Sequence, residues 1–197
     1  DGKENLDGCN TGWGCHDVTE HHLDAYGLRD TVEHDGSNYY GLIDGVIDAH
    51  KAGEPVLYYT WTPFWLNFIL APGKEVEWLE VPYTDLPEAQ GSDVPTTFED
   101  KNLGFAINQM EIVANREFLS ENPKAERFFE VVQVPNDAVS LQNQKMRDGE
   151  NTPAAIRIHA EEWISENQDL FDGWVEAAKS APDQGLCVRK LLLEYCC

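Results

Sequence analysis

The sequence has few basic residues and no long apolar run. Lys and Arg together number 14 against 36 Asp and Glu, which gives a formal net charge of −22 at pH 7. Because phosphates repel so acidic a chain, nucleic acid and an anionic membrane surface are poor partners for it. No apolar stretch is long enough to span a bilayer, and the first residues lack the basic, apolar and small-residue pattern of a signal peptide. We therefore expect a chain that does not cross a membrane.

Cysteine is also scarce, with 5 in 197 residues. Cys9 and Cys15 lie in one short loop, whereas Cys187, Cys196 and Cys197 lie near the end of the chain. There is no second Cys/His pair at zinc-finger spacing. Spacing alone leaves three readings of the first pair open, namely a ring-closing disulfide, two free thiols and half of a metal site.

The most distinctive stretch is residues 8–15, Gly-Cys-Asn-Thr-Gly-Trp-Gly-Cys. Glycines on both sides of Trp13 allow positive φ and a close approach of the backbone to a ligand. An indole face attracts a cation that has no hydrogen to donate, such as a quaternary ammonium. The N–H groups of a glycine turn can hold a carboxylate. The loop therefore predicts a site for both ends of a betaine.

A second aromatic run, residues 58–65, reads Tyr-Tyr-Thr-Trp-Thr-Pro-Phe-Trp. It follows residues 55–59, the best strand candidate in this half, and it leads into a helix expected from Pro63 to about Leu70. Trp61 thus lies at a strand-to-helix junction, which is where open α/β sheets bind ligands. Tyr59 is a further candidate for lining the pocket, and the other aromatic residues of the run are expected to pack in the core.

Together with Phe171-Asp172-Gly173-Trp174-Val175, these motifs make residues 1 to about 181 resemble the glycine betaine/proline betaine binding proteins of osmoprotectant ABC transporters. The resemblance implies an α/β fold of the periplasmic-binding-protein type II, with two lobes, a hinge and a tryptophan box. Carried over by position, Trp13 and Trp61 are two walls of the box, and the N–H groups of Gly14 and Cys15 contact the ligand carboxylate. The resemblance also implies a Cys9–Cys15 disulfide. It implies no catalytic residue, no cofactor and no metal.

The same resemblance sets the expected organisation of the chain. Residues 1–78 are the ligand-binding lobe, residues 79–181 are the C-terminal part of the second lobe, and residues 182–197 are an atypical tail. The family has a further box tryptophan and a carboxylate-binding histidine in a segment before residue 1. We therefore expect the N-terminal part of one lobe to be missing and the chain alone to bind betaine weakly.

Hydrophobic periodicity predicts the regular elements. Helices are expected over about 16–26, 38–52, 63–70, 116–120, 123–131, 137–148, 154–166 and 170–178. Strands are expected over 31–34, 55–59, 76–81 and 105–114. Residues 82–103, rich in Pro, Asp and Thr, are predicted to form a long surface loop.

Three histidines, His16, His21 and His22, raise a metal or catalytic alternative. Adjacent residues point in different directions, and neither His16/His21 nor His21/His22 has the i, i+4 spacing of a helical zinc pair. A disulfide would also remove Cys15 as a nucleophile. The acidic residues Glu20 and Asp24 are expected on a solvated helix face.

The sequence thus predicts a binding protein and not an enzyme. It would capture glycine betaine or a related quaternary ammonium osmoprotectant in the periplasm, or otherwise outside the cytoplasm, and would present it to an ABC transporter permease. Its association with the membrane would run through that transporter. The alternatives are a binding protein for choline, carnitine or a sulfonium analogue and, with less support, a thiol- or metal-dependent hydrolase.

Overall fold

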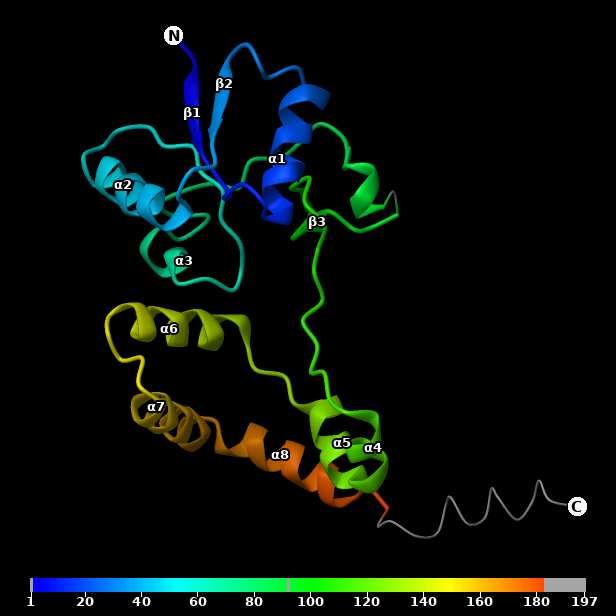
Figure 1. Cartoon of the computed structure of the whole chain (residues 1–197). Helices are drawn as coiled ribbons and strands as arrows, with labels where there is room; N and C mark the ends of the chain where they lie inside the picture. The colour runs from blue at the N-terminus through cyan, green and yellow to red at the C-terminus, as the bar shows by residue number, and fades with distance from the viewer. Residues whose placement is uncertain (1, 92, 183–197) are drawn as a thin grey trace, which may run out of the picture. The chain divides into compact units, whose positions relative to one another are not determined.

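A computed structural model describes residues 2–91 and 93–182, and these divide into two compact units (Figure 1). The first unit ends at Gln109 and the second begins at Met110. The predicted lobe boundary after residue 78 falls inside the first unit and stays a prediction. The predicted tail, residues 182–197, lies outside the described residues apart from Pro182.

The first unit is built on a βαβ motif. Strand β1 (Glu4–Asp7) pairs in parallel with β2 (Val32–Asp35), and helix α1 (Gly14–Ala25) connects them. On the other edge of β1, Asp7 forms a parallel bridge with Tyr58, because the Asp7 amide donates to the Leu57 carbonyl at 3.0 Å and the Tyr59 amide donates to the Asp7 carbonyl at 2.9 Å. β1 therefore lies between two parallel neighbours. The carboxyl ends of all three segments lie at the same end of the sheet.

Helix α2 (Tyr39–Lys51) supplies one side of the core of the first unit. Its buried residues, Tyr39, Ile43, Val46 and Ile47, recur at the spacing of one helical face. They pack against buried residues in and around the short helix α3 (Leu66–Ile69), namely Phe64, Trp65, Leu66 and Leu70. The second aromatic run thus contributes two residues to this core, and its Tyr58, Tyr59 and Trp61 pack against it.

The rest of the first unit has little regular structure. A 3-10 turn, η1 (Glu88–Gln90), is followed by a small antiparallel hairpin of β3 (Thr97–Phe98) and β4 (Lys101–Asn102). This segment is tied to α1 through His21 and His22. Nε2 of His21 lies 2.6 Å from Oδ1 of Asp85, and the buried ring of His22 packs edge-on against Phe105.

The second unit is helical. It contains α4 (Arg116–Glu121), α5 (Pro123–Val131), α6 (Asn136–Arg147), α7 (Pro153–Glu166) and α8 (Gln168–Lys179). Trp163 of α7 stacks on Trp174 of α8 with ring centroids 6.0 Å apart, and buried His159 contacts Gln142 and Glu150. Trp174 is buried and belongs to the core of this unit.

Most of the predicted helices are confirmed, but of the four predicted strands only 31–34 is confirmed, as β2. Residues 55–59 contribute the single bridge of Tyr58. Residues 76–81 contribute one bridge, from Val76 to Pro72, and one backbone hydrogen bond, from the Val81 amide to the Asn102 carbonyl. Residues 105–114 form no strand, and Met110, Ile112 and Val113 are exposed, Val113 by 93%. A strand needs partners for its backbone groups along its whole length, whereas among the described residues one backbone hydrogen bond, from the Ile107 amide to the Pro95 carbonyl at 2.8 Å, joins this segment to a distant neighbour.

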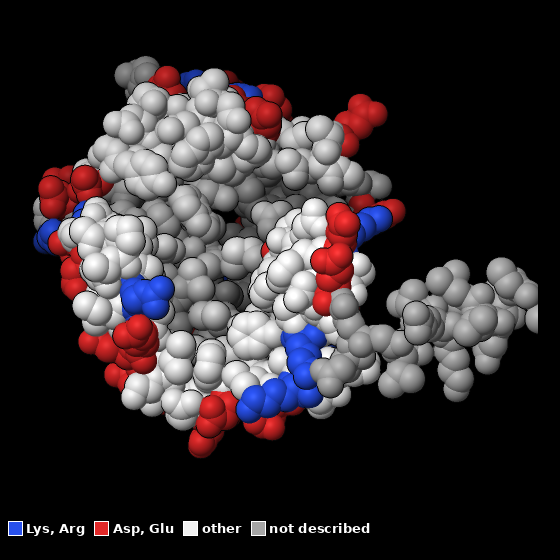
Figure 2. Space-filling model, turned by 60° about the horizontal axis from the view of Figure 1, so that its bottom comes forward, with Lys and Arg blue, Asp and Glu red and all other residues white. Residues whose placement is uncertain are grey.

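The surface and the helices agree with the composition. On the face shown in Figure 2, Asp and Glu side chains are scattered, with fewer Lys and Arg side chains among them. Among the described residues, no helix combines the length and the apolar character that a bilayer span requires. The mixture of helices with a small parallel sheet confirms the predicted α/β class at that level.

Candidate ligand-binding site

The loop after β1 is closed by a disulfide. Cys9 and Cys15 are bonded, with their Cα atoms 5.9 Å apart, which confirms the predicted pairing. Cys9 is fully buried, and the Thr11 amide donates to the Gly36 carbonyl at 3.1 Å. The loop that carries Trp13 is therefore anchored at both ends and in its middle.

Helix α1 begins inside this loop. Trp13 has an extended backbone and occupies the capping position, where no side chain accepts a hydrogen bond from the helix. Gly14 and Cys15 are the first two helical residues, so their N–H groups have no acceptor within the helix. These donors, at the positive end of the helix dipole, suit an anion such as a carboxylate.

The loop that follows Tyr59 brings a second tryptophan to the first. The ring centroids of Trp13 and Trp61 lie 6.3 Å apart with their planes at 75°. Both rings are half-buried and pack against the core. One face of Trp61 is stacked on Phe64, with centroids 4.2 Å apart. The two indoles therefore form a near-perpendicular corner. The structure thus brings together all four predicted ligand residues, because Gly14 and Cys15 directly follow Trp13.

The sequence analysis missed Tyr39, which joins the two loops. Its amide donates to Oδ1 of Asn10 at 2.6 Å, and its hydroxyl donates to the carbonyl of Tyr59 at 2.9 Å. Its fully buried ring lies 5.7 Å from that of Trp13 and 5.3 Å from that of Trp61. A signal was present, because Tyr39 shares the helical spacing of the apolar residues of α2.

The tyrosines around the two indoles are neutral phenols. Burial raises the pKa of Tyr58 to about 12 and that of Tyr59 to about 12, and it also raises the pKa of Tyr39. None of the three supplies a phenolate at physiological pH. They can attract a cation only through their ring faces, as the two indoles do.

The packing residues of the second aromatic run also lie as expected. Phe64 and Trp65 are buried, which confirms their predicted core role. Tyr59 packs between Trp61 and Phe105, with ring centroids 6.0 and 5.1 Å away. Tyr59 therefore packs beside the indole corner, as expected of a packing residue, and its role in lining a pocket stays a prediction.

Comparison with known proteins decides the family. Residues 1–166 match the model of OpuAC, described as the substrate binding domain of the ABC-type glycine betaine transport system. The chain belongs to the OpuAC family. This OpuAC chain is 42% identical over 181 residues to the glycine betaine-binding periplasmic protein OusX of Dickeya dadantii, and equally identical over 181 residues to the glycine betaine/proline betaine-binding periplasmic protein of Escherichia coli.

The Salmonella typhimurium glycine betaine/proline betaine-binding periplasmic protein is 40% identical over 181 residues. Each match covers 92% of the OpuAC chain but only 54–55% of the relative. The chain therefore spans about half the length of the curated relatives it matches.

We predict that removing the disulfide destabilises the first unit of the OpuAC chain. For a ring of this size the chain-entropy model gives a loss of about 2 kcal/mol in the free energy of unfolding. Urea unfolding of the Cys9→Ala/Cys15→Ala double variant measures the loss. Reductant should destabilise the parent by a similar amount and leave the double variant unchanged; equal stability of parent and variant would contradict the prediction.

A second prediction concerns Tyr39. Tyr39→Phe keeps the ring but removes the hydrogen bond to the Tyr59 carbonyl, so the free energy of unfolding should fall by about 1 kcal/mol. Tyr40→Phe is the matched control, because Tyr40 is the next residue and is 56% exposed. Its stability should stay within about 0.5 kcal/mol of the parent. Equal effects of the two substitutions would mean that Tyr39 does not join the loops.

Proposed function

We propose that this chain is part of an extracytoplasmic, periplasmic binding protein that captures glycine betaine or a related quaternary ammonium osmoprotectant for uptake by an ABC transporter. The observation that carries the proposal is the indole corner of Trp13 and Trp61 beside two helix-start N–H groups. The printed names of the relatives, which are glycine betaine-binding periplasmic proteins, support the same ligand.

The corner suits the cationic end of a betaine. A trimethylammonium group is rounded, carries a permanent charge and has no N–H to donate, so it gains more from aromatic faces than from hydrogen bonds. Each such contact contributes about 0.5–1 kcal/mol in water and about 2 kcal/mol or more when desolvated. Two indoles at 75° can contact two sides of the group at once. The neutral tyrosines behind them keep the surroundings apolar.

The start of α1 suits the other end. In glycine betaine one methylene separates the cation from the carboxylate, so both charges must be read within a few ångströms. Trp13, Gly14 and Cys15 are consecutive, and a cation on the indole therefore leaves its carboxylate close to the two N–H groups. In this proposal the disulfide keeps Trp13 and the helix start in register.

The lobe assignment belongs to the same proposal. Residues 1–78 supply the face described above, and residues 79–181 are the C-terminal part of a second lobe of a type II periplasmic binding fold. Closure about a hinge would desolvate the cation and so strengthen its contacts with the indoles. The closed complex would then be presented to the permease. No catalytic step, cofactor or resident metal is needed for this role.

The alternative ligands differ at the carboxylate. Choline has the same cation but no carboxylate, so it would leave the Gly14 and Cys15 donors unpaired. Carnitine and sulfonium analogues keep a carboxylate and change the spacer or the cation. A competition series over these compounds therefore separates the two halves of the site.

We predict that Trp13→Ala and Trp61→Ala each weaken glycine betaine binding by roughly 10- to 30-fold, which corresponds to about 1.4–2 kcal/mol for one desolvated contact. Calorimetric titration measures the affinity. Trp163→Ala is the control, because this tryptophan belongs to the helices of the second unit, and its affinity should equal that of the parent.

A ligand that lacks the positive charge completes this test. 3,3-Dimethylbutanoate has the shape and carboxylate of glycine betaine with carbon in place of the quaternary nitrogen. It should bind far more weakly than betaine if the indoles attract a charge. Equal binding of the two ligands, or unchanged betaine affinity in both tryptophan variants, would overturn the assignment of the site.

A further inference from the structure

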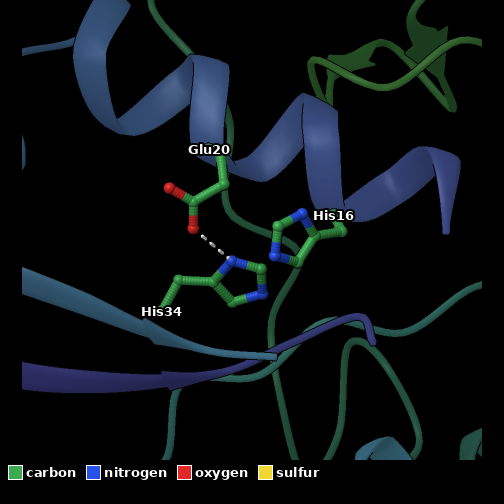
Figure 3. Close-up of side chains that lie close together, drawn as sticks. All are labelled: His16, Glu20 and His34. Atoms are coloured by element: carbon green, nitrogen blue, oxygen red, sulfur yellow. Dashed lines mark hydrogen bonds and ion pairs between the residues drawn. The ribbon is translucent and has the colours of Figure 1, made fainter. Parts of the chain in front are cut away.

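Three side chains with metal-ligating atoms meet on the side of α1 that faces β2 (Figure 3). They are His16 and Glu20 of α1 and His34 of β2. One ligand atom from each lies within 4.8 Å of those of the other two. This cluster is separate from the indole corner, and the proposed betaine site does not use it.

Sequence spacing explains how the cluster forms. His16 and Glu20 are four residues apart, so both lie on one face of α1. This i, i+4 spacing is the one that helical metal pairs use. The sequence pattern predicted Glu20 on a solvated face of the helix. That prediction was wrong, since Glu20 is half-buried between Arg29 and His34.

Two glycines make room for the imidazoles. A Cβ atom at Gly8 would lie 2.1 Å from Nε2 of His34, and one at Gly36 would lie 2.8 Å from Cδ2 of His16. Any larger residue at either position would displace a ring. The centroids of the two rings are 4.9 Å apart. The two glycines thus leave room for both imidazoles to lie near Glu20.

The carboxylate is held in its ionised form. Nδ1 of His34 donates to Oε1 of Glu20 at 2.7 Å, and Arg29 donates to Oε2 at 2.5 Å. Desolvation raises the pKa of Glu20, but the hydrogen bonds from Arg29 and His34 outweigh it and leave that pKa below its usual range. Oε1 therefore carries negative charge beside Nδ1 of His34.

Each of the two histidines has a ring nitrogen without a short hydrogen bond. The His34 side chain is only 1% exposed, and its Nε2 is buried without a hydrogen-bond partner among residues 2–91 and 93–182. The His16 ring has only long contacts, at 3.4 Å, with Thr11 and Asp17. No short hydrogen bond therefore holds the His16 ring nitrogens, whereas His34 is fixed by its surroundings.

We propose that His16, Glu20 and His34 bind a divalent transition-metal ion, with Zn²⁺ the best match. Two imidazole nitrogens and one carboxylate oxygen are a familiar zinc ligand set, and they leave a fourth position for water. With bonds of about 2.0–2.1 Å, tetrahedral ligand atoms lie about 3.3 Å apart, so side-chain shifts of about 1–2 Å complete the site.

The ion takes the place of the proton that His34 shares with Glu20. His34 then binds through Nδ1 and stays neutral by carrying its proton on Nε2. Because Nε2 has no partner, this transfer breaks no other hydrogen bond. Glu20 keeps its bond to Arg29 through Oε2. The bound ion would link α1 to β2. It would lie next to the disulfide loop, because His16 directly follows Cys15 in the chain.

The test is calorimetric titration of the full chain, prepared without a histidine tag, with Zn²⁺. Two competing kinds of site must be removed. Excess Mg²⁺ occupies the acidic surface, and the substitutions Cys187→Ser, Cys196→Ser and Cys197→Ser remove the tail thiols from every variant. We expect binding of one ion per chain and a Zn²⁺-dependent rise in melting temperature, since only the folded chain holds the site.

Three variants locate the ion. His16→Ala and Glu20→Gln should each weaken Zn²⁺ binding by more than about tenfold, since even outer-shell changes at metal sites cost about 10- to 100-fold. His50→Ala is the control. It should leave the affinity unchanged, because His50 lies on α2 and does not belong to the cluster. Circular dichroism checks that each variant folds.

Other outcomes would overturn the proposal. They are the absence of saturable Zn²⁺ binding in excess Mg²⁺, and Zn²⁺ binding that neither His16→Ala nor Glu20→Gln weakens. Weakening by His50→Ala to the same extent would also overturn it. Betaine affinity is measured separately on the same variants, so failure here leaves the proposed betaine site untouched.

Discussion

The candidate site depends on one buried residue, Tyr39. Its backbone amide donates a hydrogen bond to Asn10 in the disulfide loop, and its hydroxyl donates one to the carbonyl of Tyr59 in the second aromatic run. Its ring lies against both Trp13 and Trp61. Because a buried phenol must satisfy its hydroxyl, the distance between the two loops is set by the reach of one tyrosine.

The sheet explains why these loops are neighbours at all. β1 pairs with β2 on one edge and with the segment ending at Tyr59 on the other, so the loops after Asp7 and after Tyr59 leave from the same end. Parallel pairing thus brings residues about 50 positions apart to one place. The disulfide and Tyr39 then refine a proximity that the strand order has already produced.

Local chemistry made much of this predictable. Glycines around a tryptophan, two cysteines in one loop and an aromatic run after a strand are all visible in the sequence, and the helices of the second unit follow from their periodicity. Tyr39 was harder to identify, because its role rests on contacts with residues far away in the chain. The His16/Glu20 pair has the spacing of a helical metal pair, but the third residue of the cluster, His34, lies on β2 and meets the pair only in the fold.

The errors have a common physical cause. Residues 105–114 have the apolar and β-branched character of a strand, but strand formation needs a neighbour, and Ile112 and Val113 are exposed instead. Glu20 looked like a surface acid because its partners, Arg29 and His34, come later in the chain. Propensity describes a residue by itself, whereas pairing and ion binding depend on which segments the fold brings together.

Amide-resolved NMR during a betaine titration shows whether the indole corner and the start of α1 bind the two ends of one ligand. Betaine should shift the backbone N–H signals of Gly14 and Cys15 together with the indole N–H signals of Trp13 and Trp61. Choline, which lacks the carboxylate, should shift the indole signals with little change at the two amides. Betaine-induced shifts confined to other residues, such as Trp163 and Trp174, would place the ligand elsewhere.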